Sequence, residues 1–81
     1  MQILYFSWLR ERVGEASEEI ETQAATPADL ITELKTRGGG HAMAFDDISA
    51  IRVAVDQQMV ELDHPLEGAR EVAFFPPMTG G

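Results

Sequence analysis

The rest of the chain is predicted to fold around one segment, Thr26-Pro27-Ala28-Asp29-Leu30-Ile31-Thr32-Glu33-Leu34-Lys35-Thr36-Arg37. Thr26 can cap a helix, and Pro27 suits the first helical position. The apolar side chains share one face of that helix, and they are Leu30, Ile31 and Leu34. The run Gly38-Gly39-Gly40 then reads as a left-handed stop and a flexible connection. We therefore predict a helix over residues 27–37 with one buried face.

Strand patterns lie on both sides of this helix. Strands are predicted at residues 2–8, 17–22, 51–55, 59–62 and 70–75. Between them we expect a helical turn at residues 9–12, which Gly14 closes, an irregular stretch through Asp46-Asp47, and a turn at residues 56–58. The second strand suits an edge position, antiparallel to the first. The element order is therefore β, β, α, β, β, β, which is the order of the ubiquitin-like β-grasp. The predicted fold class is α+β, with a mixed sheet packed on one main helix.

The length of 81 residues indicates one domain. We divide the chain into a β-grasp domain over residues 1–75 and a flexible Gly-Gly tail over residues 76–81. So small a chain leaves little room for a deep catalytic pocket, which favours an interaction or carrier role over a self-contained enzyme. The absence of cysteine removes disulfides, thiolate nucleophiles and zinc–thiolate sites from consideration.

The charge balance narrows the choice of partner. Six Lys and Arg residues face 14 Asp and Glu residues, a net charge of −8, which repels nucleic acid and anionic membranes and favours a partner with a basic face. No stretch approaches the roughly 20 apolar residues of a membrane helix, so a soluble cytoplasmic protein is expected. No metal site is expected, because His41 and His64 are far apart in sequence. The pairs Glu18-Glu19 and Asp46-Asp47 read as a solvated acidic surface.

The chemistry is predicted to lie in the segment Phe74-Phe75-Pro76-Pro77-Met78-Thr79-Gly80-Gly81. The six residues after Phe75 can extend about 20 Å, far enough to enter a partner's active site. Glycines lack Cβ atoms, so an enzyme channel can close around their backbone. The carboxylate of Gly81 can attack a nucleotide phosphate to give an acyl-adenylate. Sulfide would convert the acyl-adenylate to a thiocarboxylate, whereas a lysine amine would convert it to an isopeptide bond. The alternative to both reactions is that the two terminal glycines are simply a frayed chain end.

Strand alternation also predicts a docking surface. If Ile3 and Tyr5 face the helix, together with the matching residues of the other strands, then three apolar side chains point to the opposite face. They are Phe6, Met59 and Phe75. Exposed apolar patches usually mark interfaces, unless a loop covers them.

Three segments carry a resemblance to a known family: Asp63-His64-Pro65-Leu66, Glu71-Val72-Ala73-Phe74-Phe75-Pro76-Pro77 and Thr79-Gly80-Gly81. They are similar to the small subunit of molybdopterin synthase, the MoaD sulfur carrier family. The resemblance implies that Gly81 is adenylated by a MoeB-like enzyme, which uses ATP, and becomes a thiocarboxylate. Inserted into a MoaE-like large subunit, this group would donate sulfur to cyclic pyranopterin monophosphate to make molybdopterin.

The same resemblance implies roles for single residues. Gly81 would be the reactive thiocarboxylate, and the inserted tail would comprise Gly80, Thr79, Met78 and Pro77; Met78 stands where a branched aliphatic residue is expected. Phe6, Met59 and Phe75 would bind partners. The subunit would be non-catalytic, bind no cofactor and form a heterotetramer with the large subunit. The open alternatives are a ubiquitin-like modifier joined to lysines, a sulfur carrier for thiamine or transfer-RNA thiolation, and a plain β-grasp interaction domain.

Overall fold

The computed structural model describes residues 1–77, so the expectations for Met78, Thr79, Gly80 and Gly81 lie outside the described residues. Its elements are β1 (Gln2–Tyr5), α1 (Trp8–Val13), β2 (Ser17–Glu19), α2 (Pro27–Lys35), α3 (Gly39–Ala44), the 3₁₀ helix η1 (Ile48–Ala50), β3 (Arg52–Val55), β4 (Gln58–Val60) and β5 (Glu71–Phe75). The predicted α+β class is confirmed. Within the described part of the chain, no helix is long and apolar enough to cross a membrane.

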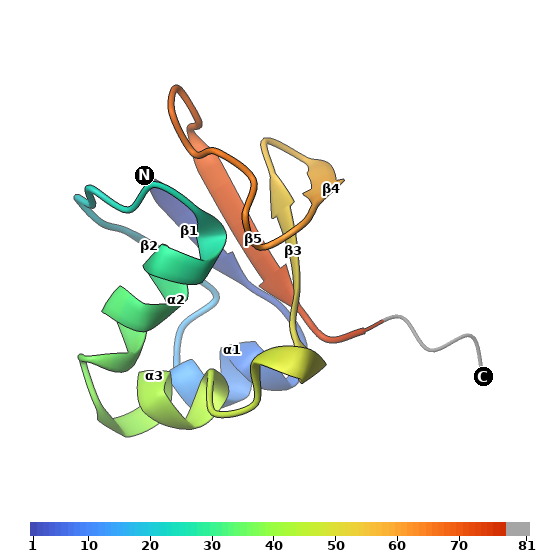
Figure 1. Ribbon diagram of the computed structural model, residues 1–81. Helices are drawn as coiled ribbons and strands as arrows, with labels where there is room; N and C mark the ends of the chain where they lie inside the picture. Colours follow the sequence, from blue (N-terminus) through green and yellow to red (C-terminus); the bar gives the residue numbers. More distant parts are fainter. Residues whose placement is uncertain (78–81) are drawn as a thin grey trace.

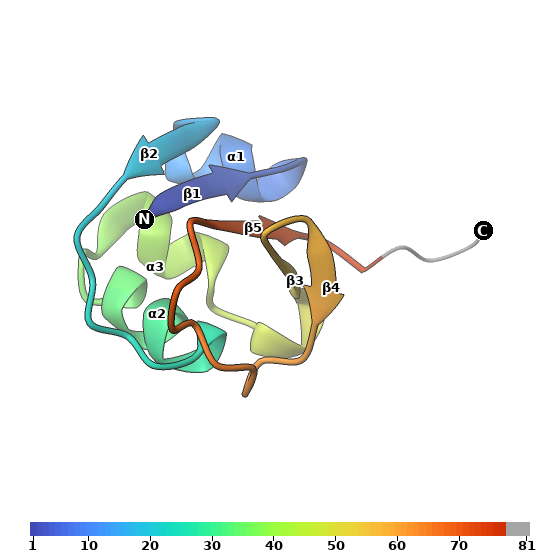
Figure 2. The ribbon, with the colours of Figure 1, turned by 90° about the horizontal axis from the view of Figure 1, so that it is seen from above.

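The strands form one mixed sheet in the order β2-β1-β5-β3-β4. Strands β1 and β5 run parallel, while β2 pairs antiparallel with β1, and β3 pairs antiparallel with both β4 and β5. Helices α2 and α3 cover one face of this sheet, whereas α1 lies at the ends of the strands, beside β1 and β2 in the view from above (Figures 1 and 2). The β-grasp arrangement and the edge position of β2 are therefore as predicted.

Helix α2 follows from its sequence. The Thr26 hydroxyl accepts a hydrogen bond from the Asp29 backbone N–H at 3.2 Å, as its capping role requires. The apolar face packs into the core, where side chains are at most 8% exposed; they include Ile3, Tyr5, Leu9, Ile20, Leu30, Ile31, Leu34, Phe45, Ile51, Val53, Val55, Leu66, Val72 and Phe74. The predicted helix is confirmed, and it ends two residues earlier than expected, at Lys35.

The prediction for the glycine run was wrong in part. Gly38-Gly39-Gly40 does end α2, but it also opens α3, where an irregular stretch was expected. A Cβ atom on Gly40 would lie 2.0 Å from the carbonyl oxygen of Arg12, so glycine lets α3 pack directly on the end of α1. The glycines therefore serve a close contact between helices as well as a stop, and that contact is not visible in a local pattern.

Two turns shape the ends of the elements. Gly14 adopts the left-handed conformation, with a φ of 94°, and closes α1 as predicted. Asp56 and Gln57 both have positive φ, 49° and 72°, which is the geometry of a tight hairpin turn between β3 and β4. The turn was expected to include Gln58, which instead begins β4.

Candidate functional site

The register of the sheet shows which side chains face away from the helices. Ile3 lies opposite Val72, and these side chains are buried against the helices. The alternate positions form a row across the sheet: Leu4 opposite Ala73, Ala73 opposite Ala54, and Ala54 opposite Met59. Successive residues of a strand point to opposite faces, so this row lies on the face opposite α2 and α3.

The sequence-predicted residues Phe6, Met59 and Phe75 border this row. The rings of Phe6 and Phe75 meet edge to face, with centroids 6.4 Å apart and planes at 83°. Phe6 is 47% exposed and Met59 is 60% exposed, so the covering-loop alternative does not hold for them within residues 1–77. Met59 lies apart from the two aromatic rings, because β3 separates β4 from β5.

We name this surface the docking face, and it comprises Leu4, Phe6, Ala54, Met59, Ala73 and Phe75. Its centre is flat, because the middle of the row consists of two alanines. Its larger side chains stand at the rim, and Phe75 is the last residue of β5. Pro76 and Pro77 follow and are half-buried, so the segment that leads to the Gly-Gly sequence starts directly beside the docking face.

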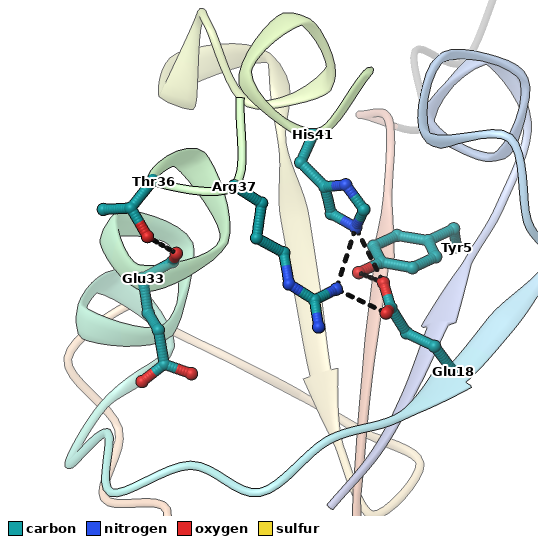
Figure 3. A network of polar contacts seen from close by, with 6 residues as sticks. All are labelled: Tyr5, Glu18, Glu33, Thr36, Arg37 and His41. Carbon is teal, nitrogen blue, oxygen red and sulfur yellow. Dashed lines mark hydrogen bonds and ion pairs between the residues drawn. The ribbon is translucent and has the colours of Figure 1, made fainter. Parts of the chain in front are cut away.

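On the side of the sheet that α2 and α3 cover, three polar side chains meet around Glu18 (Figure 3). The Tyr5 hydroxyl donates a hydrogen bond to Glu18 Oε2 at 2.7 Å, and the Arg37 guanidinium donates to Oε1. His41 Nε2 lies 2.7 Å from Oε2. The network thus joins β1, β2 and α3 with the residues that follow α2.

This network corrects the prediction that Glu18 belongs to a solvated acidic surface. Its side chain is only 13% exposed, because Glu18 lies opposite Ile3 on the inward face of β2. Partial burial alone would raise the pKa of Glu18, but hydrogen bonds from His41, Tyr5 and Arg37 outweigh it and lower the pKa to about 2. Burial, reinforced by the Glu18 carboxylate, raises the pKa of Tyr5 well above its ordinary value.

A sequence signal for Glu18 existed. Alternation from the buried Ile20 places Glu18 on the same inward face of β2, where a carboxylate needs partners. The other predicted acidic pair, Asp46-Asp47, is exposed. Among residues 1–77, no group of three or more acidic, histidine or cysteine side chains is placed to hold a metal ion.

A family model described as the ThiS family matches residues 3–81. The chain belongs to the ThiS family. It is 37% identical, over 81 residues, to the molybdopterin synthase sulfur carrier subunit of Escherichia coli, a match that spans 100% of this chain and 99% of that relative. This ThiS family chain therefore corresponds to its relative over nearly their whole lengths.

One solved structure supports the same relationship, and a second shares the fold. The fold matches a Pyrococcus furiosus protein described as molybdopterin converting factor, subunit 1, with a TM-score of 0.74, 31% identity and 95% coverage of both chains. It also matches SAMP1 of Haloferax volcanii with a TM-score of 0.73, covering 100% of this chain and 98% of that one. The identity to SAMP1 is 23%, so this second likeness shows the shared ubiquitin-like fold alone.

Proposed function

We propose that this ThiS family protein is the sulfur carrier subunit of a molybdopterin synthase. The observation that carries the proposal is the full-length likeness to the E. coli molybdopterin synthase sulfur carrier subunit, at 37% identity. The position of the docking face beside the start of the tail supports it, because a carrier must hold its partner while it presents its end. A non-catalytic subunit of this kind needs no active-site pocket of its own.

The reactive group is the carboxylate of Gly81. It attacks the α-phosphate of ATP on an adenylating partner, forming an acyl-adenylate and releasing pyrophosphate. A sulfur nucleophile at the oxidation level of sulfide then displaces AMP, which leaves a thiocarboxylate on Gly81. In the large synthase subunit, the thiocarboxylate sulfur forms a bond to a carbon of cyclic pyranopterin monophosphate as a carbon–oxygen bond of that substrate breaks. Water then cleaves the bond between the sulfur and the Gly81 acyl carbon, which returns the carboxylate and leaves the sulfur on the pterin. Two carrier chains supply the two sulfur atoms of the product.

The rest of the chain positions this group. The segment of Pro77, Met78, Thr79 and Gly80 enters the large subunit, while the docking face binds that subunit's surface through Phe6, Met59 and Phe75. Two carriers and two large subunits form a heterotetramer. The catalytic side chains belong to the large subunit, and the carrier binds no cofactor; ATP is used by the adenylating partner.

The charge and composition support this assignment of partners. With a net charge of −8, the carrier is attracted to basic partner surfaces, which speeds encounter with either enzyme. We place the protein in the cytoplasm, where ATP is available for its activation.

Intact mass spectrometry tests the carrier chemistry. The chain is incubated with ATP, an adenylating enzyme and a sulfide source, in parallel with a variant that lacks Gly81. The expected result is a mass gain that matches one oxygen replaced by sulfur, absent from the deletion variant. The thiocarboxylated chain, mixed with the large subunit, is then expected to convert cyclic pyranopterin monophosphate to molybdopterin.

The deletion variant is expected to keep the circular dichroism spectrum and melting temperature of the intact chain, because chain ends contribute few packed contacts. Loss of the folded circular dichroism spectrum in the variant that lacks Gly81 would contradict that expectation. No mass gain with a demonstrably active adenylating enzyme would overturn the carrier function. Covalent products on the lysines of other proteins would instead support the modifier alternative.

A further inference from the structure

A groove borders the docking face on the side of β4. It runs between η1 and the β3–β4 hairpin, and its lining includes Ile48, Arg52, Met59 and Leu62. Ile48 is 44% exposed and Met59 is 60% exposed, so the groove holds two large apolar side chains that residues 1–77 leave open to solvent. Met59 belongs to both the groove and the docking face, so the two surfaces are continuous.

The groove also lies at the start of the tail. Arg52 is the first residue of β3 and pairs in register with Phe75, the last residue of β5. Paired residues of neighbouring strands point to the same face of a sheet, so Arg52 stands beside Phe75 on the face opposite α2 and α3. Figure 1 shows the end of β5 next to the start of β3. A partner that holds the tail therefore lies within reach of Arg52.

Backbone carbonyl groups hold Arg52 in place, and no carboxylate of residues 1–77 forms an ion pair with it. Its Nη1 donates to the backbone carbonyl oxygens of Ser49, at 3.3 Å, and Ile51, at 3.1 Å. The ion pairs found among residues 1–77 involve Met1, Arg37 and His41, and none involves Arg52. Glu61 lines the same groove without forming an ion pair to it.

Among the six Lys and Arg residues, Arg37 is the one found in an ion pair within residues 1–77, so the lack of an ion pair does not by itself distinguish Arg52. Arg52 is distinguished by its place, because it lines the groove and pairs in register with Phe75 at the start of the tail. A guanidinium has five N–H donors in a planar fork, and the two backbone carbonyls use only one of its nitrogen atoms. The remaining donors suit a carboxylate, which arginine binds in a bidentate manner.

We infer that this groove receives a segment of the large synthase subunit, in which a carboxylate side chain binds Arg52 and a neighbouring apolar side chain packs against Ile48 and Met59. The inference rests on the proposed function. Arg52 is then a specificity residue. A partner with a carboxylate at this position forms an ion pair with Arg52 when the tail is correctly docked, whereas a partner with a basic side chain there is repelled.

Calorimetric titration with the large subunit tests the groove. Arg52→Glu is expected to weaken binding by tenfold or more, a loss of about 1.4 kcal/mol or greater, because two carboxylates would then face one another. The matched control is Arg70→Glu, which makes the same charge change on an exposed residue at the other end of β5. Arg70→Glu is expected to change affinity by less than about threefold.

The apolar half of the groove is tested in the same titration. Ile48→Ser is expected to weaken binding, while Met43→Ser is expected to leave it unchanged. Met43 is a suitable control because it is 62% exposed and lines a different hollow, beside Trp8. Melting temperatures measured for all four variants separate a loss of binding from a loss of folding.

A charge exchange identifies the partner carboxylate. Each surface Asp or Glu of the large subunit is changed to Arg and combined with Arg52→Glu, and one exchange is expected to restore affinity. Equal affinities for folded Arg52→Glu and Arg70→Glu variants, or no restoring exchange, would overturn the inference while leaving the carrier function intact. Failure of the unaltered chain to bind the large subunit would instead overturn the proposed function itself.

Discussion

At the scale of single residues, Glu18 shows how neighbours determine the behaviour of a charged group. Its carboxylate lies on the inward face of β2, and it stays ionised because Tyr5, Arg37 and His41 surround it with donors. Such a charge stabilises a fold only while its partners are present, since a buried unpaired carboxylate is costly. The same network connects β1 and β2 with α3.

Glu18→Gln is expected to lower the free energy of unfolding by about 1 to 3 kcal/mol at pH 7, as measured by urea denaturation. The fall in the pKa from 4.5 to about 2, at about 1.4 kcal/mol for each unit, corresponds to about 3.5 kcal/mol, and this value is a ceiling on the expected loss. A carboxylate whose pKa is lowered in the folded state contributes its stability above pH 4.5 and loses it as the pH falls toward 2. The difference between variant and parent should therefore shrink over that interval.

Glu19→Gln is the control for Glu18→Gln. Glu19 is 70% exposed and contacts only the amino-terminal ammonium among the ion pairs of residues 1–77, so its removal is expected to change stability by less than about 1 kcal/mol. An equal loss in the free energy of unfolding for both variants at pH 7 would contradict a stabilising role for the network around Glu18. A stability difference between Glu18→Gln and the parent that persisted at pH 2 would contradict it too.

Gln57→Gly is expected to raise the melting temperature, with a gain of about 0.5 to 1 kcal/mol in the free energy of unfolding. Gln57 has a φ of 72° and is exposed in the turn between β3 and β4, where glycine relieves the strain of a left-handed backbone. Gln58→Gly is the matched control, because it places glycine in β4, where a strand is weakened. A destabilised Gln57→Gly variant would contradict this account of the turn.

At the scale of elements, the contact between α1 and α3 explains what the glycine run does. The backbone of α3 passes so close to the last turn of α1 that no side chain fits at Gly40. The packed pair then supports Phe45, which is fully buried and meets Phe74 of β5 with ring centroids 5.0 Å apart. The glycines thus contribute to the same core that holds the last strand in place.

Gly40→Ala is expected to destabilise the protein by about 1 to 3 kcal/mol, because the added Cβ atom would force α3 away from the Arg12 carbonyl oxygen. Thermal unfolding monitored by circular dichroism measures the loss. Gly39→Asn is the control: a Cβ atom there meets open space, and asparagine tolerates the positive φ of 52° better than most residues. Equal melting temperatures for Gly40→Ala and the parent would show that the helices separate at no cost.

At the scale of the whole molecule, the sheet divides two tasks between its faces. The face covered by α2 and α3 builds the core, and the docking face has two buried alanines at its centre, with the exposed Phe6 and Met59 and the half-buried Phe75 at its rim. Parallel pairing of β1 with β5 brings Phe6, just after β1, beside Phe75 at the end of β5. Partner contacts and the start of the tail therefore lie together.

Phe75→Ala is expected to weaken binding of the large subunit by about 1 to 4 kcal/mol, because aromatic anchors at interfaces carry much of the binding free energy. Calorimetric titration measures the loss, and Met43→Ala is the control, since Met43 is exposed outside the docking face. The melting temperature should fall little, because Phe75 is only half-buried. If Phe75→Ala bound the large subunit with unchanged affinity, Phe75 would not be an anchor of the docking face.

The sequence by itself determined the elements whose signals are local. The cap at Thr26, the apolar face of α2, the alternation of β3 and the stop at Gly14 each depend on residues within one or two turns of chain. For that reason the order of the five strands and α2, the β-grasp fold and the outward position of Phe6 and Met59 could be predicted, whereas α3 was missed. The likeness of the segment from Glu71 to Gly81 to a known family also required no structure.

Only the tertiary structure decided how segments distant in sequence meet. The role of Gly40 depends on Arg12, the ionised state of Glu18 depends on Arg37 and His41, and the setting of Arg52 depends on Phe75. Each pair is separated by about 20 residues or more, so no periodicity links its members. Burial and hydrogen bonding, which set the cost of a charge or a Cβ atom, are properties of the packed chain and arise only when those segments come together.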